Sequence, residues 1–138
     1  MNGPATRLAL IGAVAVALAA CAAPKEVEPE PNVLPVNYKQ EILNALLRVL
    51  EDPTNVKDAF ITDPMLTVAP GGRDPRYIVC VKYNPRAGRQ YLGSRERLGT
   101  FFNGHLNQLV ETGTEQCAKA AYKPFPELEK MCLAKKCD

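Results

Sequence analysis

Apolar residues recur at intervals of three and four positions along residues 38–51, and polar residues occupy the opposite side of the same stretch. The apolar positions are Ile42, Leu46, Val49 and Leu50, with Leu43 and Leu47 beside them. This spacing predicts an amphipathic helix, which Asn37 should cap and Asp52-Pro53 should end, because the residue before a proline disfavours helical backbone angles. We expect its apolar side to face the core of a small domain rather than a membrane or a partner helix.

Three later segments have the pattern of β-strands. Residues 76–84 are β-branched and aromatic, lie between two prolines and are apolar on both faces, which predicts a central strand covered on both sides. Residues 95–102 and 105–111 are predicted as the second and third strands, because Asn103-Gly104 between them is the preferred two-residue hairpin turn.

The remaining segments are less clearly patterned. Val56, Ala59 and Phe60 fit a helical turn, and prolines and glycines divide residues 61–75 into short extended pieces and turns. Near the C-terminus, Pro126 suits the first position of a last short helix.

These elements predict one small α+β domain over residues 38–132, followed by a basic tail at 133–138. In this fold an N-terminal amphipathic helix packs on one face of a small three-stranded antiparallel meander. A C-terminal helical segment covers part of the other face.

The N-terminus carries a secretory pattern. After Arg7, the thirteen residues 8–20 contain no polar side chain, which is short for a membrane-spanning helix of about 20 residues and typical of a signal peptide. The run ends in Leu18-Ala19-Ala20-Cys21, which resembles the lipobox of bacterial lipoprotein precursors. The resemblance implies cleavage after residue 20, a diacylglyceryl group on the Cys21 thiol and acylation, such as palmitoylation, of its new amino group. The alternatives are an ordinary cleaved signal with an incidental cysteine and a short uncleaved anchor.

The segment after Cys21 is rich in proline and glutamate. Four prolines between positions 22 and 36 exclude regular helix or sheet, so residues 21–37 are predicted as the lipidated cysteine and an extended tether that holds the domain off the bilayer. In lipoproteins of this kind an aspartate after the cysteine commonly retains the protein at the inner membrane. Ala22 and Ala23 therefore imply the outer membrane, with the domain facing the periplasm.

The other four cysteines predict structural disulfides. Cys80, Cys117, Cys132 and Cys137 are an even number in a chain exported to an oxidising compartment. None of them has the C-x-x-C spacing of a zinc, haem or redox site, although a metal site and free thiols stay as alternatives. We predict the pairs Cys80–Cys117 and Cys132–Cys137, because Cys80 is central in the sheet and Cys117 opens the segment that returns over it.

The sequence predicts neither catalysis nor a cofactor. His105 is the only histidine and follows a hairpin turn. The sequence has no nucleophile motif such as G-x-S-x-G for which His105 could act as the catalytic base. The segments 77–85 and 117–126 resemble stretches of small uncharacterised envelope lipoproteins, a resemblance that implies no activity. Cleavage removes one of 17 basic residues and leaves 15 acidic ones, and this balance argues against nucleic acid as a partner.

The clearest charge signal is basic. Four arginines follow the first strand or begin the second, so they are expected at one end of the sheet: Arg86, Arg89, Arg95 and Arg97. Arginine binds phosphate and carboxylate through two parallel hydrogen bonds. We therefore predict an anion-binding site for lipid headgroups, lipopolysaccharide phosphates or peptidoglycan carboxylates, with an ordinary solvated surface as the alternative.

Together these features predict a lipid-anchored, non-enzymatic envelope protein that acts as an interaction or structural module. Its partners are the membrane, through the lipid on Cys21, and an anionic envelope component or an envelope protein. The main alternative is a small inhibitor or accessory subunit of a periplasmic enzyme or transport complex. A hydrolase without a recognisable motif is a third.

Overall fold

The computed structural model describes residues 32–68, 72, 74–111 and 115–131. In chain order the elements are α1 (Tyr38–Val49), β1 (Asp52–Ile61), β2 (Met65–Val68), β3 (Pro75–Ala87), β4 (Gln90–Tyr91), β5 (Arg95–Phe102), β6 (His105–Glu111), α2 (Glu115–Ala118), β7 (Lys123–Pro124) and α3 (Pro126–Glu129). The predicted signal peptide, the lipobox with Cys21, most of the tether and the basic tail lie outside the described residues.

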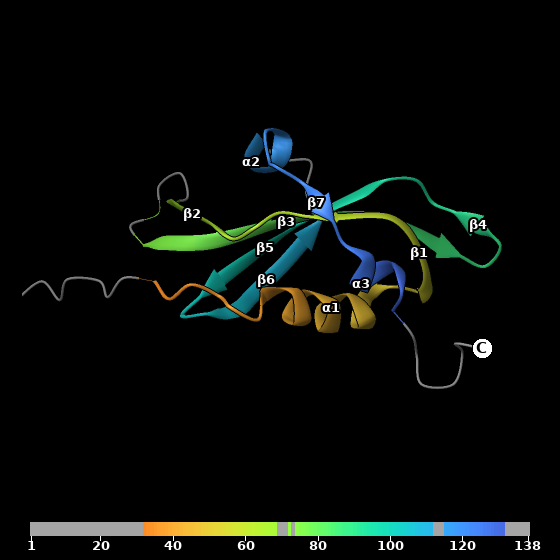
Figure 1. Ribbon diagram of the computed structural model, residues 1–138, viewed down its shortest axis with the longest axis horizontal. Coiled ribbons are helices and arrows are strands. Elements are labelled where there is room, and N and C mark those ends of the chain that lie inside the picture. Colours follow the sequence, from red (N-terminus) through yellow and green to blue (C-terminus); the bar gives the residue numbers. More distant parts are fainter. Residues whose placement is uncertain (1–31, 69–71, 73, 112–114, 132–138) are drawn as a thin grey trace, which may run out of the picture.

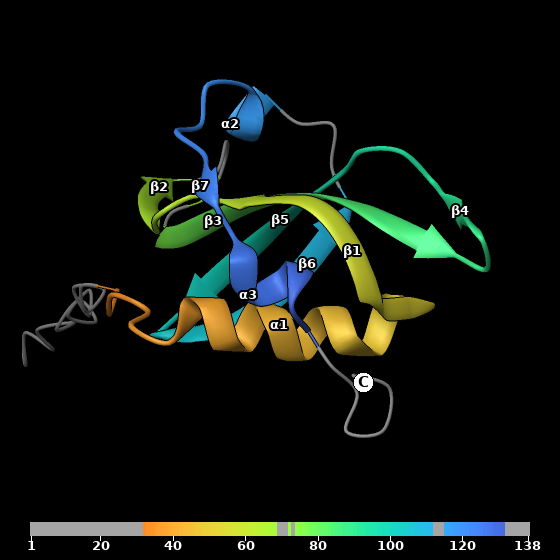
Figure 2. The ribbon, with the colours of Figure 1, turned by 45° about the vertical axis from the view of Figure 1, so that its right-hand side comes forward.

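A single antiparallel sheet organises the molecule (Figure 1). Its strand order is β6-β5-β3-β1-β7, and β2 and β4 also pair with β3. β3 is the longest strand, with 13 residues. At its end it pairs with β4 to form an arm that extends beyond the rest of the sheet (Figures 1 and 2).

The predicted three-stranded meander is wrong, because the sheet has seven strands. The main omission is β1, which occupies the region interpreted as a helical turn and pairs with the other side of β3. Two register shifts and a positive φ of 51° at Asp58 interrupt β1. Each register shift leaves residues of β1 without a partner in β3. Such unpaired residues interrupt the alternation of buried and exposed positions by which a strand is recognised in a sequence.

Several individual elements match their predicted positions. The helix begins at Tyr38 but ends at Val49, and β5 and β6 coincide with the predicted strands. Asn103 and Gly104 both have positive φ, of 49° and 81°, as the two-residue hairpin turn requires. The predicted cap is wrong, because the Asn37 side chain makes no capping hydrogen bond.

The sheet is covered on both faces, as predicted for its central strand. α1 and α3 lie on one face and α2 on the other (Figure 2). The prediction that the C-terminal helix from Pro126 covers the face opposite α1 is therefore wrong, because its Leu128 packs in the same core as Ile42 and Leu46. On the α1 face, Ile42 and Leu46 pack with Val79, Val81 and other buried side chains. α1 comes close to the sheet over Gly99, where a Cβ would lie 3.2 Å from both Ile42 Cδ1 and Leu106 Cδ1.

The opposite face holds a smaller core around a disulfide. Cys80 and Cys117 are bonded, as predicted, with their Cα atoms 5.8 Å apart, and they pack with Ile78 and Leu98. The bond attaches α2 to the central strand. Cys132 and Cys137 lie outside the described residues, so their pairing stays a prediction.

Candidate functional site

The arm formed by β3 and β4 carries two of the four predicted anion-binding arginines. β3 continues to Ala87, Gly88 turns the chain with a φ of 58°, and Tyr91 of β4 pairs with Arg86. The Leu92 amide donates to the Pro85 carbonyl at 2.9 Å and closes the arm. The turn therefore places Arg86 and Arg89 at the tip.

Two cations flank the ring of Tyr91 at this tip. Lys57 Nζ lies 4.5 Å from the ring centroid, and Arg86 Cζ lies 5.9 Å from it. Arg86 Nε also donates to the Gly88 carbonyl at 3.0 Å, and Arg89 is exposed. We call Lys57, Arg86, Arg89 and Tyr91 the basic tip. Lys57 was missed in the sequence because it belongs to β1, whose pairing with β3 had no recognisable signal.

An acidic residue lies near the tip. Asp52 pairs with Arg86 in the register of β1 and β3. The Thr54 hydroxyl and amide donate to its carboxylate at 2.6 and 3.0 Å, and these bonds, more than the charge of Arg86, lower the pKa of Asp52. The carboxylate thus has its own local donors, and none of the ion pairs among the described residues involves Arg86 or Arg89.

The structure places the other two arginines in the body of the sheet, where both have partners. Arg95 forms an ion pair with Glu111 of β6 at 3.4 Å. Arg97 Nε donates to the Tyr83 hydroxyl at 2.8 Å. Burial raises the pKa of Tyr83 and outweighs the opposing effect of Arg97, so the phenol is neutral. The four arginines are therefore divided, with two at the tip and two engaged by neighbouring side chains.

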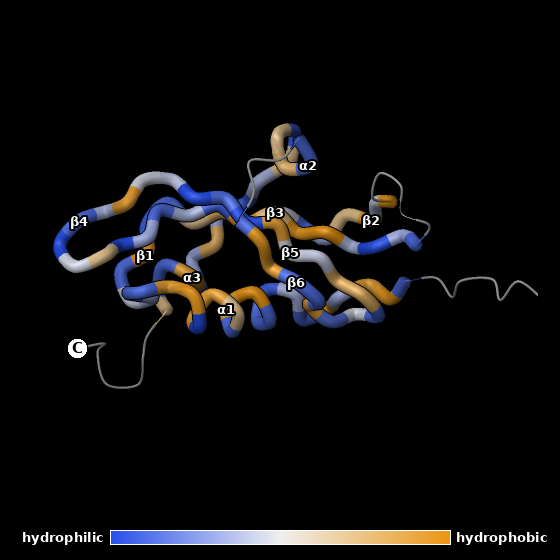
Figure 3. Tube along the Cα trace, turned by 180° about the vertical axis from the view of Figure 1, so that it is seen from behind, coloured by the Kyte–Doolittle hydropathy of each residue, from blue (hydrophilic) through white to orange (hydrophobic). Residues whose placement is uncertain are grey.

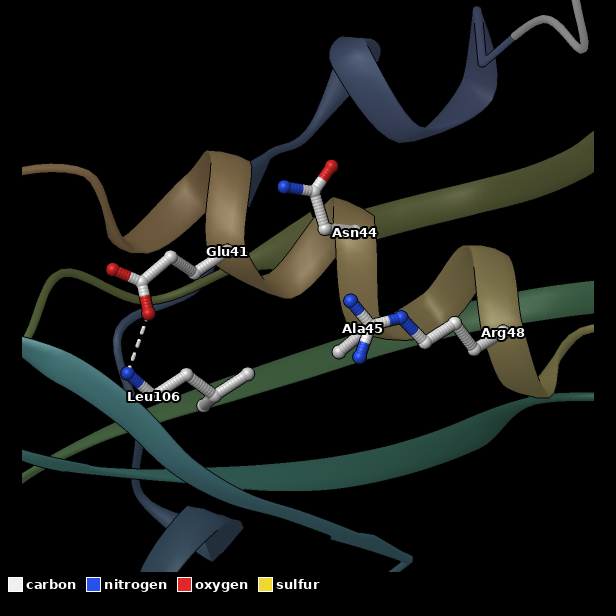
Figure 4. A pocket seen from close by; sticks show the side chains of 5 residues that line it. All are labelled: Glu41, Asn44, Ala45, Arg48 and Leu106. Carbon is white, nitrogen blue, oxygen red and sulfur yellow. Dashed lines mark hydrogen bonds between the residues drawn. The ribbon is translucent and has the colours of Figure 1, made fainter.

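A separate shallow cavity of about 210 Å³ lies between α1 and β6 (Figure 4). It is lined by Glu41, Asn44, Ala45, Arg48 and Leu106. Glu41 accepts the Leu106 amide at 2.5 Å and lies 3.3 Å from His105 Nδ1, so its carboxylate is already bonded to the edge strand. These five lining residues, all in the described part of the chain, include no hydroxyl or thiol nucleophile.

The described residues contain neither a metal-binding cluster nor a membrane-spanning helix. Within them, no cluster of three or more histidine, cysteine, aspartate or glutamate side chains is arranged to hold a metal ion. No helix in the same part of the chain is long and apolar enough to cross a membrane.

Comparison with known proteins adds no assignment. No protein-family model matches the chain. Neither a curated protein nor a solved structure shows significant similarity to it.

Proposed function

We propose that the protein is a lipid-anchored envelope protein that is attached to the outer membrane through Cys21 and acts there as a non-enzymatic interaction module facing the periplasm. Two independent features support this proposal. The sequence Leu18-Ala19-Ala20-Cys21 follows an apolar run of signal-peptide length. The buried Cys80–Cys117 disulfide is a type of bond that persists in oxidising compartments such as the periplasm.

The basic tip is the proposed contact with an anionic envelope component. The observation that carries this proposal is the position of Lys57 and Arg86 beside the Tyr91 ring, with exposed Arg89 in the turn of the same projecting arm. Arg86 and Arg89 can each offer a planar donor pair to a phosphate or carboxylate. Arg95 and Arg97 are not part of the basic tip, and each has a side-chain partner in the sheet, Glu111 and Tyr83 respectively.

The anchor is tested by the Cys21→Ser variant of the full precursor. We expect loss of radiolabelled palmitate incorporation, accumulation of the uncleaved precursor and loss of mature protein from the outer-membrane fraction. Cys132→Ser is the control, because it changes a cysteine remote from the signal peptide. A Cys21→Ser protein that is cleaved and fractionates like the wild type would contradict the anchor.

The contact is tested by cosedimentation with lipopolysaccharide, anionic vesicles and peptidoglycan at low and physiological salt. Each cation near an anionic surface contributes about 1 kcal/mol. The double variant Arg86→Gln, Arg89→Gln should therefore bind about thirtyfold more weakly at low salt. The matched variant Arg95→Gln, Arg97→Gln removes the same charge and should retain most of the binding. Equal losses in the two variants, or no binding by the wild type at low salt, would refute the role of the tip.

A further inference from the structure

The end of the sheet opposite the basic tip carries most of the exposed apolar surface. Among the described residues, ten large apolar side chains are exposed, and six of them lie there, with exposed fractions between 42% and 80%. We call this set the apolar end: Val33, Leu34, Val36, Leu66, Val68 and Phe102. Contiguous apolar surface on a small protein usually marks a site of contact with another protein or a membrane.

Three segments that are distant in sequence meet at this end. The Asn32 side chain donates to the Pro75 carbonyl at 2.7 Å and accepts the Asn103 amide at 2.9 Å, which fixes the chain entering α1 between β3 and the β5–β6 turn. A Cβ at Gly104 would lie 3.5 Å from Val33 Cγ1. Val68 of β2 pairs with Pro75, and the strand register puts Leu66 and Val68 on the face of the sheet opposite to Phe102, so the apolar side chains surround the end of the sheet on both faces. Figure 3 colours β2 and the segment before α1 as hydrophobic at this end.

Two described side chains of opposite charge lie beside the apolar end. Arg76 Cζ lies 4.6 Å from the centroid of the Phe102 ring, and Asp74 is exposed two positions earlier in the chain. An arginine in this position can cover an aromatic ring with its stem and keep its head in a polar layer. Attraction at this end should therefore be mainly apolar and should depend little on salt, in contrast to attraction at the basic tip.

We propose that the apolar end lies on the surface of the lipid bilayer that carries the acyl chains of Cys21. This inference rests on the proposed lipid anchor. Asn32 follows Cys21 by eleven positions, so the fully extended connection spans at most about 36–40 Å. The described chain enters the domain at the apolar end itself (Figure 1), so the connection to Cys21 starts from the apolar surface.

Because the lipid anchor already attaches the domain to the bilayer, a weak apolar contact is enough to keep the apolar end on the surface. A short connection holds the domain at an effective concentration in the millimolar range relative to the surface. The last residues of the predicted tether also belong to the domain, because Pro35 is buried and Asn32 bonds the sheet. The proposal therefore replaces the expectation that residues 22–36 hold the domain away from the bilayer.

The experiment uses the lipidated protein reconstituted in vesicles that contain brominated phospholipids. The chain has no tryptophan, so a single introduced tryptophan is an unambiguous reporter. We expect Phe102→Trp emission to be quenched by brominated lipid, and Tyr91→Trp emission at the basic tip to be unaffected. The two positions are matched, because each is an exposed aromatic residue of a strand beside a cation.

Two further measurements make the result specific. Adding Leu66→Ser and Val68→Ser to Phe102→Trp should remove most of the quenching, and raising the salt to about 1 M, where the Debye length is about 3 Å, should not. Mass spectrometry of the Cys21 peptide checks the anchor separately, so its failure is distinguished from a failure of docking. If the lipid is confirmed but the tryptophan at position 102 is not quenched, the proposal is overturned. The apolar end then faces water or a second copy of the chain. Equal quenching at both positions overturns it as well.

Discussion

The Cys80–Cys117 disulfide should supply a large share of the domain's stability. The two residues are 37 positions apart. In the loop-closure treatment a cross-link of this length destabilises the unfolded chain by about 4 kcal/mol at 25 °C. Small domains have unfolding free energies of about 5–15 kcal/mol, so removal of the bond should leave a marginally stable protein.

The variant Cys80→Ala, Cys117→Ala removes the bond without leaving free thiols. With a urea dependence of about 1–3 kcal/mol per molar, a loss of about 4 kcal/mol lowers the unfolding midpoint by roughly 1–4 M. Both cysteines are buried with Ile78 and Leu98, so the cavity left by the two sulfur atoms adds to the loss. Circular dichroism in a urea titration, without reductant, measures the midpoint and the slope.

The control is Cys132→Ala, Cys137→Ala, which keeps the bond between the sheet and α2. Its midpoint should stay close to that of the wild type, because the predicted second pair cross-links only the tail. A change below about 1 kcal/mol in the Cys80, Cys117 variant would refute the loop-closure argument for this protein. An equally large loss in the control would instead indicate that the tail cysteines contribute to the same core.

Three further predictions concern the packing and charge of the domain. Gly99→Val should destabilise it by about 1–3 kcal/mol in urea titration, because the new side chain meets Ile42, and a neutral result would mean that α1 can move aside. Tyr122→Phe should cost about 1 kcal/mol by the same assay, because the phenol donates to Glu96 at 2.9 Å, and an unchanged midpoint would show that water replaces this bond. Hydrogen bonds from Thr54 lower the pKa of Asp52 in the folded protein below its usual 3.8. The contribution of Asp52 to stability is therefore present above about pH 4 and is lost on further acidification. Asp52→Asn should therefore reduce the fall in unfolding free energy below about pH 4, as measured by urea titrations at several pH values. The same fall in the variant and the wild type would contradict this role of Asp52.

The sequence predicted the elements whose signals are local. The helix at 38–51 has a regular apolar period, and the strands at 95–102 and 105–111 flank a turn that demands positive φ. β3 extends to Ala87, beyond the predicted end at residue 84, because Pro85 does not end the strand. Pro85 is tolerated inside the strand, since it lies opposite an irregular part of β1 where the ladder of hydrogen bonds is interrupted.

β1 could not be recognised from its pattern. Val56 and Ala59 are both buried, three positions apart, with exposed Lys57 and Asp58 between them. That spacing imitates a helical turn, but here it arises from an irregular strand in which Asp58 has positive φ. Without β1 the predicted sheet lacked the strand that supplies Lys57 to the basic tip.

The sequence identified the arginines of the candidate site but did not predict which of them lie together. The arginines at 86 and 89 follow directly from the turn after β3, which is local information. The partners of the other two are contacts between strands: Glu111 is 16 positions from Arg95, and Tyr83 is 14 positions from Arg97. Such pairs depend on strand order and register, which charge counting along a sequence does not contain.

The length of β3 constrains how the two proposed contacts can operate together. Thirteen residues in extended conformation separate the apolar end from the basic tip by about 40 Å. Attraction to the charged headgroups of a bilayer decays over about 8 Å at physiological salt. With β3 upright, a domain that rests on its own membrane through the apolar end would hold Arg86 and Arg89 beyond the reach of those headgroups. Under both proposals together, the anion at the basic tip would belong to another layer of the envelope, and of the ligands considered, peptidoglycan carboxylates would fit that position better than the lipids around the anchor.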